Sequence, residues 1–178
     1  MRYNNNGLLT LRMTCVANSL DKVEIEFSMR LASSEDSHDV WIWRNEEVTR
    51  QMSRNQNLIS WQDHNDWFRR SLESSTRVIF IGTVNSQAVS AVRYDHHELL
   101  ESGLEISISV AREWRGVGVG QRSIFVSLNS IKDFFPLSNL VVANIRMQNL
   151  ASIKTFLKCG FREMSQVERD FLRFELPI

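Results

Sequence analysis

An arginine followed by three glycines at alternate positions is the feature with the clearest chemistry in this sequence, and it spans residues 115–120, Arg-Gly-Val-Gly-Val-Gly. Glycines let backbone N–H groups approach an anion closely, and the positive end of a helix dipole adds to the attraction. Residues 104–110 alternate between apolar and polar, which predicts a half-buried strand. Apolar residues then recur at helical spacing, at Ile124, Phe125, Leu128, Ile131 and Phe135. Strand, turn and helix therefore meet at a site suited to a phosphate group.

The spacing of the glycines excludes two common nucleotide loops. A P-loop needs Lys and Ser or Thr after its last glycine, and Gln121 and Arg122 stand there instead. A dinucleotide-binding fingerprint that began at Gly116 would need a third glycine at position 121. The alternative interpretation is a tight turn that binds no ligand. We favour it less, because three glycines within five residues follow an arginine.

A second motif lies nearer the C-terminus, after an apolar strand predicted over residues 140–147. Asn149 begins an Asn-x-x-Ser segment and is a good N-cap for a short helix, and Gly160 supplies its left-handed C-cap. Taken together and in this order, the two motifs resemble those of the GNAT superfamily of acyl-CoA N-acyltransferases. The resemblance covers residues 23–176 and joins an Arg/Gln-x-x-Gly-x-Gly/Ala loop to an Asn-x-x-Ser helix.

The resemblance implies an α/β (α+β) fold in which about four helices flank a mixed, mainly antiparallel sheet. Residue patterns fit it, with a strand predicted over 23–31, helices over 34–47 and 61–73, a hairpin of 78–84 and 89–94, and a last strand over 170–176. Capping boxes at Ser33 and Ser60 begin the two helices. We expect one GNAT acetyltransferase domain over residues 22–178, and an N-terminal extension over residues 1–21 whose loop-like composition could leave it disordered.

The resemblance also implies transfer of an acetyl group from acetyl-CoA to an amine. Main-chain groups of the strand would bind the pantetheine arm, and one N–H near its end would stabilise an oxyanion, a donor worth about 3 kcal/mol. The glycine loop would hold the pyrophosphate. The expected cofactor-binding residues are Ile108, Val110, Arg115, Gly116, Val117, Gly118, Val119, Gly120, Gln121, Asn149 and Phe156.

One position departs from the pattern of the family. Many members carry a tyrosine four residues after the serine of the Asn-x-x-Ser motif, and its hydroxyl protonates the departing thiolate. This sequence has Phe156 there, which has no proton to give. Water or another group could act as the acid, the thiolate could leave unassisted, or catalysis could be lost. We favour an active enzyme, because both motifs are otherwise intact, and we assign no general acid.

Acetyl transfer to an amine also needs a general base. Glu105 lies on the polar side of the predicted strand, where family members often carry a carboxylate, and it could act through water; a solvated carboxylate at a sheet edge is an equally good interpretation. His64 is a weaker alternative, because a histidine among aromatic residues is more often packed and hydrogen-bonded. His96 and His97 lie in a predicted loop without a recurring metal-ligand spacing, so we expect no metal site.

The acceptor must be inferred from the first half of the chain, where four of the five tryptophans lie between positions 41 and 67. Flat aromatic faces with planar hydrogen-bonding groups suit a sugar or a nucleobase, although tryptophans can equally anchor helices on a sheet. Several short blocks resemble the N-acetyltransferases of nonulosonic acid pathways, which acetylate a nucleotide-linked amino sugar such as a UDP-4-amino-4,6-dideoxy sugar. The resemblance makes Arg44, Asn45, His64 and Trp67 substrate-binding candidates. Its blocks are Trp43-Arg-Asn45, Met52-Ser53, Ile59-Ser60, His64 with Trp67-Phe68, residues 92–95 and residues 105–107.

Two other functions stay open at this point. A peptide or ribosomal-protein N-terminal acetyltransferase would share the whole CoA half and would need an open groove for a peptide. A non-catalytic CoA-binding module is favoured only by Phe156. Zero net charge argues against nucleic-acid and membrane partners, and two cysteines with no apolar run near 20 residues are typical of a cytoplasmic chain. We expect a small-molecule amine as partner, and a monomer or a homodimer.

Overall fold

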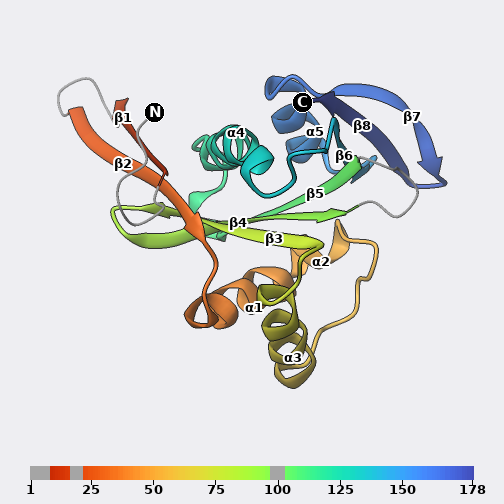
Figure 1. Cartoon of the computed structure of the whole chain (residues 1–178), viewed down its shortest axis with the longest axis horizontal. Coiled ribbons are helices and arrows are strands. Elements are labelled where there is room, and N and C mark those ends of the chain that lie inside the picture. The colour runs from red at the N-terminus through yellow and green to blue at the C-terminus, as the bar shows by residue number, and fades with distance from the viewer. Residues whose placement is uncertain (1–8, 17–21, 97–102) are drawn as a thin grey trace.

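The computed structural model describes residues 9–16, 22–96 and 103–178. Its strands form one eight-stranded sheet (Figure 1). They are β1 Leu9–Val16, β2 Lys22–Leu31, β3 Arg77–Val84, β4 Gln87–His96, β5 Gly103–Val110, β6 Leu140–Arg146, β7 Arg162–Glu168 and β8 Phe171–Pro177. Their order across the sheet is β1-β2-β3-β4-β5-β6-β8-β7. All neighbouring pairs are antiparallel except β5 and β6, which confirms the mixed, mainly antiparallel sheet.

Helices cover both faces of the sheet (Figure 1). One face carries α1 Ser37–Asn45, α2 Glu47–Gln51 and α3 Trp61–Leu72, and the other carries α4 Val119–Ser130 and α5 Leu150–Lys158. Three short 3-10 turns accompany them, at Ser34–Asp36, Arg112–Trp114 and Ile131–Asp133. The described residues thus contain five α-helices where about four were expected. The extra one arises because Glu46, with φ of −59° and ψ of 137°, breaks the helix predicted over 34–47.

The alternation of apolar side chains along the strands builds a core on each side of the sheet. Phe80, Val92 and Ile106 belong to the core under α4, and Ile79 and Ala91 belong to the one under α1 and α3. The hairpin between β3 and β4 turns as predicted. Its two turn residues, at 85 and 86, have φ values of 47° and 68°, as a tight hairpin turn requires. The period-two pattern therefore predicted both faces of the central strands correctly.

Helix α4 contacts the sheet through hydroxyl groups as well as apolar side chains. Ser123 Oγ lies 2.7 Å from Ser90 Oγ, and Ser127 Oγ lies 2.8 Å from the hydroxyl of Tyr94. All four residues are buried, and these hydrogen bonds satisfy their hydroxyl groups where the helix meets the sheet. Phe125, which the helical spacing placed on the apolar face, is instead 54% exposed. The predicted apolar stripe was wrong at this position, because serines face the sheet beside Ile124.

The sheet begins before the predicted start of the domain. Strand β1 lies inside the segment 1–21 that was expected to be an extension, and it pairs with β2 from Leu9 opposite Met29 to Val16 opposite Lys22. Residues 1–8, 17–21 and 97–102 lie outside the described residues, so the interpretations that concern His97 and the extreme N-terminus fall outside them as well.

The connection from β2 to α1 is fixed by one buried carboxylate. Asp36 accepts two hydrogen bonds of 2.7 Å from Arg30 and one of 2.8 Å from the backbone N–H of Ser33. Burial works to raise the pKa of Asp36, but these donors outweigh it and hold the pKa below its ordinary value of 3.8. Asp36 therefore stabilises the fold when ionised, and it positions α1 against the sheet.

We expect Asp36→Asn to lower the free energy of unfolding by about 2 kcal/mol at pH 7, because charge-assisted hydrogen bonds are lost. Since the folded-state pKa is lowered, this stabilisation is present above pH 4 and is lost as the pH falls below it. Urea unfolding at several pH values measures the difference. Asp39→Asn, at an exposed position on α1, is the control. A difference of the same size at pH 3 and pH 7 would contradict this role.

Candidate active site

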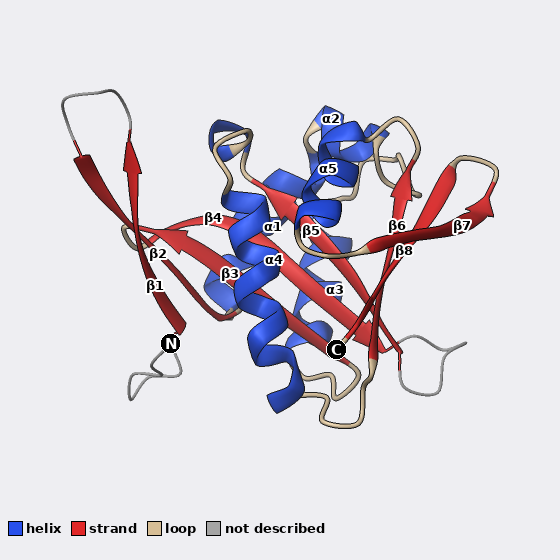
Figure 2. Cartoon of the chain, turned by 90° about the horizontal axis from the view of Figure 1, so that it is seen from above, coloured by secondary structure: helices blue, strands red, loops and turns tan. Residues whose placement is uncertain are grey.

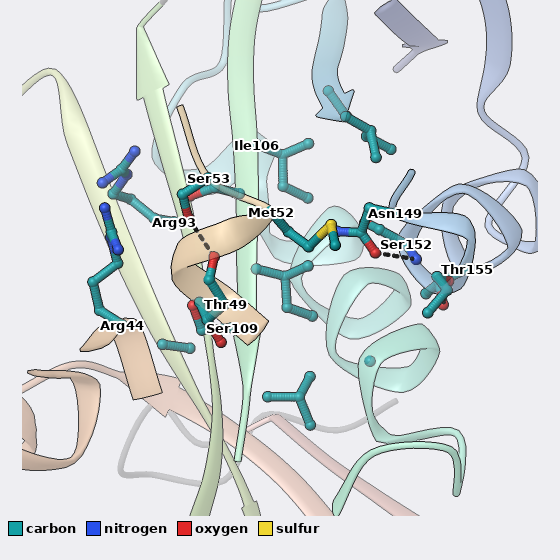
Figure 3. A pocket seen from close by; sticks show the side chains of 18 of the residues that line it. Arg44, Thr49, Met52, Ser53, Arg93, Ile106, Ser109, Asn149, Ser152 and Thr155 are labelled. Atoms are coloured by element: carbon teal, nitrogen blue, oxygen red, sulfur yellow. Dashed lines mark hydrogen bonds between the residues drawn. The ribbon is translucent and has the colours of Figure 1, made fainter. Parts of the chain in front are cut away.

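The strands β5 and β6 separate soon after they begin (Figure 2). They pair only from Gly103 opposite Leu140 to Glu105 opposite Val142. Beyond this point a cavity of about 940 Å³ lies between the two strands and extends to both helical layers. That volume is at the upper end of ordinary ligand pockets, enough for an extended cofactor arm and a second molecule. Figure 3 shows side chains from α1, α2, β4, β5 and α5 around it.

The edge of β5 that faces the cavity presents main-chain groups. The N–H of Ala111 bonds to Val89 of β4, and in an antiparallel pair alternate residues point their main-chain groups the same way. Ser107 and Ser109 therefore point theirs at β4, whereas Ile108 and Val110 point theirs at the side that β6 has left. The carbonyl of Val110 accepts a hydrogen bond from Arg115 Nε, which leaves the N–H of Val110 and both main-chain groups of Ile108 on the cavity side for a ligand or water. This is the arrangement expected for a pantetheine arm at these two residues.

The glycine loop lies where β5 leads into α4. Gly116 and Gly118 have φ values of 79° and 86°, which favour glycine, and a Cβ at either would have no protein atom within 4 Å. Helix α4 begins directly after Gly118, so the first N–H groups of the helix lack helical partners. The loop thus offers backbone donors and open space to an anion. Of the neighbouring valines, Val117 is exposed and Val119 is buried, and neither side chain lines the cavity.

The side chain of Arg115 makes three contacts with other parts of the protein. Its Nη2 donates to Glu46 Oε2 and to Thr49 Oγ1, each at 3.0 Å, and its Nε donates to the carbonyl of Val110, also at 3.0 Å. Arg115 therefore braces the loop against the junction of α1 and α2. These three acceptors occupy the guanidinium, whereas the contacts predicted between the loop and the pyrophosphate are main-chain ones.

Helix α5 brings the second motif to the opposite wall of the cavity. Asn149 caps it as predicted, since its Oδ1 accepts from the N–H of Ser152 at 3.1 Å (Figure 3). Phe156 lines the cavity but is only 2% exposed, and its ring packs edge-on against Phe161 with centroids 4.9 Å apart. Gln121 and Gly120 line the cavity from α4. Phe156 therefore supplies an apolar wall.

Glu105 lies where β5 and β6 part. Its Oε1 accepts from Asn144 Nδ2 of β6 at 3.2 Å and lies 3.8 Å from a guanidinium nitrogen of Arg54. Asn144 Oδ1 is buried and has no hydrogen-bond partner among the described residues, and both Glu105 and Asn144 line the cavity. Sequence reasoning missed Asn144, because its position matters only through contact with Glu105 across the opening. The geometry suits a carboxylate that takes a proton from an incoming amine.

His64 is a packed residue of α3. It is 2% exposed, lies between Trp61 and Phe68, and donates from Nε2 to the carbonyl of Ser37 at 2.9 Å. Burial lowers its pKa, more than the hydrogen bond to Ser37 raises it. The neutral ring is thus fixed in a structural role, and the geometry favours Glu105 as the base.

The other three substrate-side candidates separate in the structure. Asn45 exchanges two hydrogen bonds of 2.8 Å with the backbone of Ile59, is not among the residues that line the cavity, and anchors the loop after α2. Trp67 does line it, with the guanidinium groups of Arg77 and Arg93 5.4 Å and 5.6 Å from its ring centroid. Arg44 also lines it.

Basic side chains outnumber acidic ones around the cavity, although the whole chain has zero net charge. The basic lining residues are Arg44, Arg54, Arg93, Arg115, Arg146, Lys154 and Lys158, and the acidic ones are Asp63 and Glu105. Within the part of the chain that the structure describes, no group of three or more His, Cys, Asp and Glu side chains could hold a metal ion. No helix there is long and apolar enough to cross a membrane.

Comparison with known proteins gives the family. The model of the acetyltransferase (GNAT) domain matches residues 27–162, so the chain belongs to this family. It is an acyl-CoA-dependent N-acetyltransferase with acetyl-CoA as co-substrate, and the open strand edge and glycine loop fit that molecule. No curated protein matches the sequence.

Solved structures share the fold at low identity. A spermidine N-acetyltransferase from Vibrio cholerae, in complex with CoA and spermine, is 15% identical, with a TM-score of 0.75 over 85% of this chain and 95% of that one. A ribosomal-protein-alanine N-acetyltransferase from Brucella melitensis is 21% identical, with a TM-score of 0.70 over 84% and 99%. An acetyltransferase from Salmonella typhimurium with acetyl-CoA is 18% identical, with a TM-score of 0.69 over 85% and 93%.

The loop predicts a charge effect at Gly118. Asparagine tolerates a positive φ better than most residues, so Gly118→Asn should fold and bind acetyl-CoA, whereas the isosteric Gly118→Asp adds a negative charge beside the pyrophosphate. We expect the aspartate to weaken acetyl-CoA binding by at least about tenfold beyond the asparagine, a difference of ~1.4 kcal/mol. Calorimetry on the two folded variants makes the comparison. Equal affinities of the two variants for acetyl-CoA would show that the loop does not bind the pyrophosphate.

Proposed function

We propose that the chain transfers the acetyl group of acetyl-CoA to the primary amine of a nucleotide-linked amino sugar. The observation that carries this proposal is the basic lining of the cavity in a chain of zero net charge. A polyamine acceptor carries several positive charges and would be repelled by such a lining. A nucleotide sugar carries phosphate groups and one amine, so the same lining attracts it.

Acetyl-CoA supplies an activated acyl group when it is bound, and the residues of this chain position the reactants. Main-chain groups of Ile108 and Val110 align the cofactor arm along the open edge of β5, and the loop 115–120 donates N–H groups to its phosphates. Glu105, held by Asn144, accepts a proton from the amine through water. Phe156 has no proton to give, and a thiolate is a weak enough base to leave without one.

Glu105→Gln tests the assignment of the base, because glutamine keeps the size and the hydrogen bond to Asn144 but takes up no proton. We expect turnover to fall about 10²-fold and the acidic limb of the pH–rate profile to shift or vanish. The acetyl-CoA KM should stay within about twofold. Glu163→Gln, an exposed carboxylate on β7, is the matched control. Wild-type turnover with an unchanged pH profile would leave bulk water as the base.

The acceptor class is tested by measuring free thiol release with a panel of amines. The panel contains a UDP-4-amino-4,6-dideoxy sugar, spermidine and a peptide with an N-terminal alanine. We expect kcat/KM for the UDP-amino sugar to exceed both others by at least about 100-fold, or ~2.7 kcal/mol in transition-state stabilisation. A faster reaction with the peptide would replace the proposal with N-terminal acetylation.

A further inference from the structure

Two arginines from different elements meet at one end of the cavity. Arg44 comes from α1 and Arg93 from β4, and both line the cavity. Their guanidinium ends point toward one another (Figure 3). Burial, followed by the charges of Arg50 and Arg93, lowers the pKa of Arg44. Two like charges that face each other in a partly buried site need a compensating group.

Arg44 also has a donor without an acceptor. Its Nη2 donates to the carbonyl of Asn55 at 2.7 Å, whereas its Nη1 is buried and has no hydrogen-bond partner among the described residues. A buried N–H that has given up water is unfavourable until it meets an acceptor. Arg44 therefore has hydrogen-bonding capacity that the described residues do not use.

The carboxylates on this side of the cavity are already engaged. Arg93 Nε lies 2.7 Å from Asp95 Oδ2, and the same carboxylate pairs with Arg77. Asp63 accepts a hydrogen bond of 2.7 Å from Ser60, at the start of α3. Since two guanidinium groups share Asp95, positive charge stays in excess where Arg44 and Arg93 meet.

We propose that Arg44 and Arg93 bind a phosphate group of the acceptor, an inference that rests on the proposed transfer to a nucleotide-linked amino sugar. The planar fork of each guanidinium matches the oxygens of a phosphate, and two adjacent forks supply the charge for a diphosphate. The bound group gives Arg44 Nη1 its acceptor and offsets the repulsion between the two arginines. It also selects the acceptor, because a polyamine brings like charge to this point.

A binding experiment tests the site without catalysis. UDP is the probe, since it carries the nucleotide and the diphosphate but no amine, and saturating desulfo-CoA keeps it out of the CoA loop. By calorimetry, we expect the wild-type protein to bind UDP, Arg44→Met and Arg93→Met to bind it at least about tenfold more weakly, and Arg44→Lys to fall between them. Arg69→Met, at an exposed position on α3, is the control and should match the wild type.

Absence of UDP binding by the wild type, or equal binding by the wild type and Arg44→Met, would overturn the proposal. Thermal unfolding checks each variant. If Arg44→Met does not fold, Arg44→Lys and Arg93→Met are compared with the wild type instead. Arg44→Lys keeps the positive charge but loses the planar fork, and Arg93→Met removes the arginine on β4.

A kinetic experiment separates this inference from the proposed function. The UDP-amino sugar is compared with the methyl glycoside of the same amino sugar, which lacks the phosphates. Arg44→Met should raise the KM for the UDP sugar at least about tenfold and leave kcat/KM for the glycoside and the acetyl-CoA KM within about twofold. Equal losses for both acceptors would overturn the phosphate site. If neither sugar is acetylated while UDP binding still depends on Arg44, the proposed function fails and the phosphate site stands.

Discussion

The early separation of β5 from β6 is the constraint on which the rest of the site depends. Main-chain groups inside a sheet are normally satisfied by a neighbouring strand, and β6 pairs with β5 only over its first three residues. The remainder of β5 keeps β4 on one side and faces a cavity on the other. Everything that the cofactor needs follows from this edge: a strand-like row of donors and acceptors, and a glycine loop at its end.

Side-chain hydrogen bonds, as well as the shared cavity, connect the cofactor half of the site to the proposed acceptor half. Arg115 connects the glycine loop to Glu46 and Thr49 at the start of α2, while its Nε holds the carbonyl at the end of β5. Helix α2 leads into the loop that Asn45 anchors through its hydrogen bonds with Ile59. Hydrogen bonds thus connect the helices beside the proposed acceptor half to the glycine loop of the cofactor half.

Local patterns predicted most of the fold, and long-range contacts decided what was missed. The hairpin turn, the cap at Asn149 and the glycine loop depend on neighbouring residues, and the structure confirms them. The contact between Arg115 and Glu46 was not predicted, since the two residues lie 69 positions apart in the sequence. Arg93 was missed for the same reason, because its neighbours come from other elements.

The side chains that choose the acceptor were also harder to predict than those that hold the cofactor. The cofactor half uses main-chain groups, and glycines reveal those in the sequence. In the acceptor site that we propose, the contacts come from charged side chains, and their role depends on whether another protein group already pairs with them. Asp95 and Arg44 look equally polar in the sequence, yet the carboxylate of Asp95 is shared between two arginines and one N–H of Arg44 has no acceptor among the described residues.

Backbone amide hydrogen exchange, measured by NMR with and without desulfo-CoA, tests the open edge of β5 most directly. The account predicts that the amides of Ile108 and Val110 exchange rapidly in the free protein and become protected when the cofactor analogue binds. The amides of Ser107 and Ser109 should change little, because they already face β4. No gain of protection at Ile108 and Val110, or a gain confined to Ser107 and Ser109, would contradict the account.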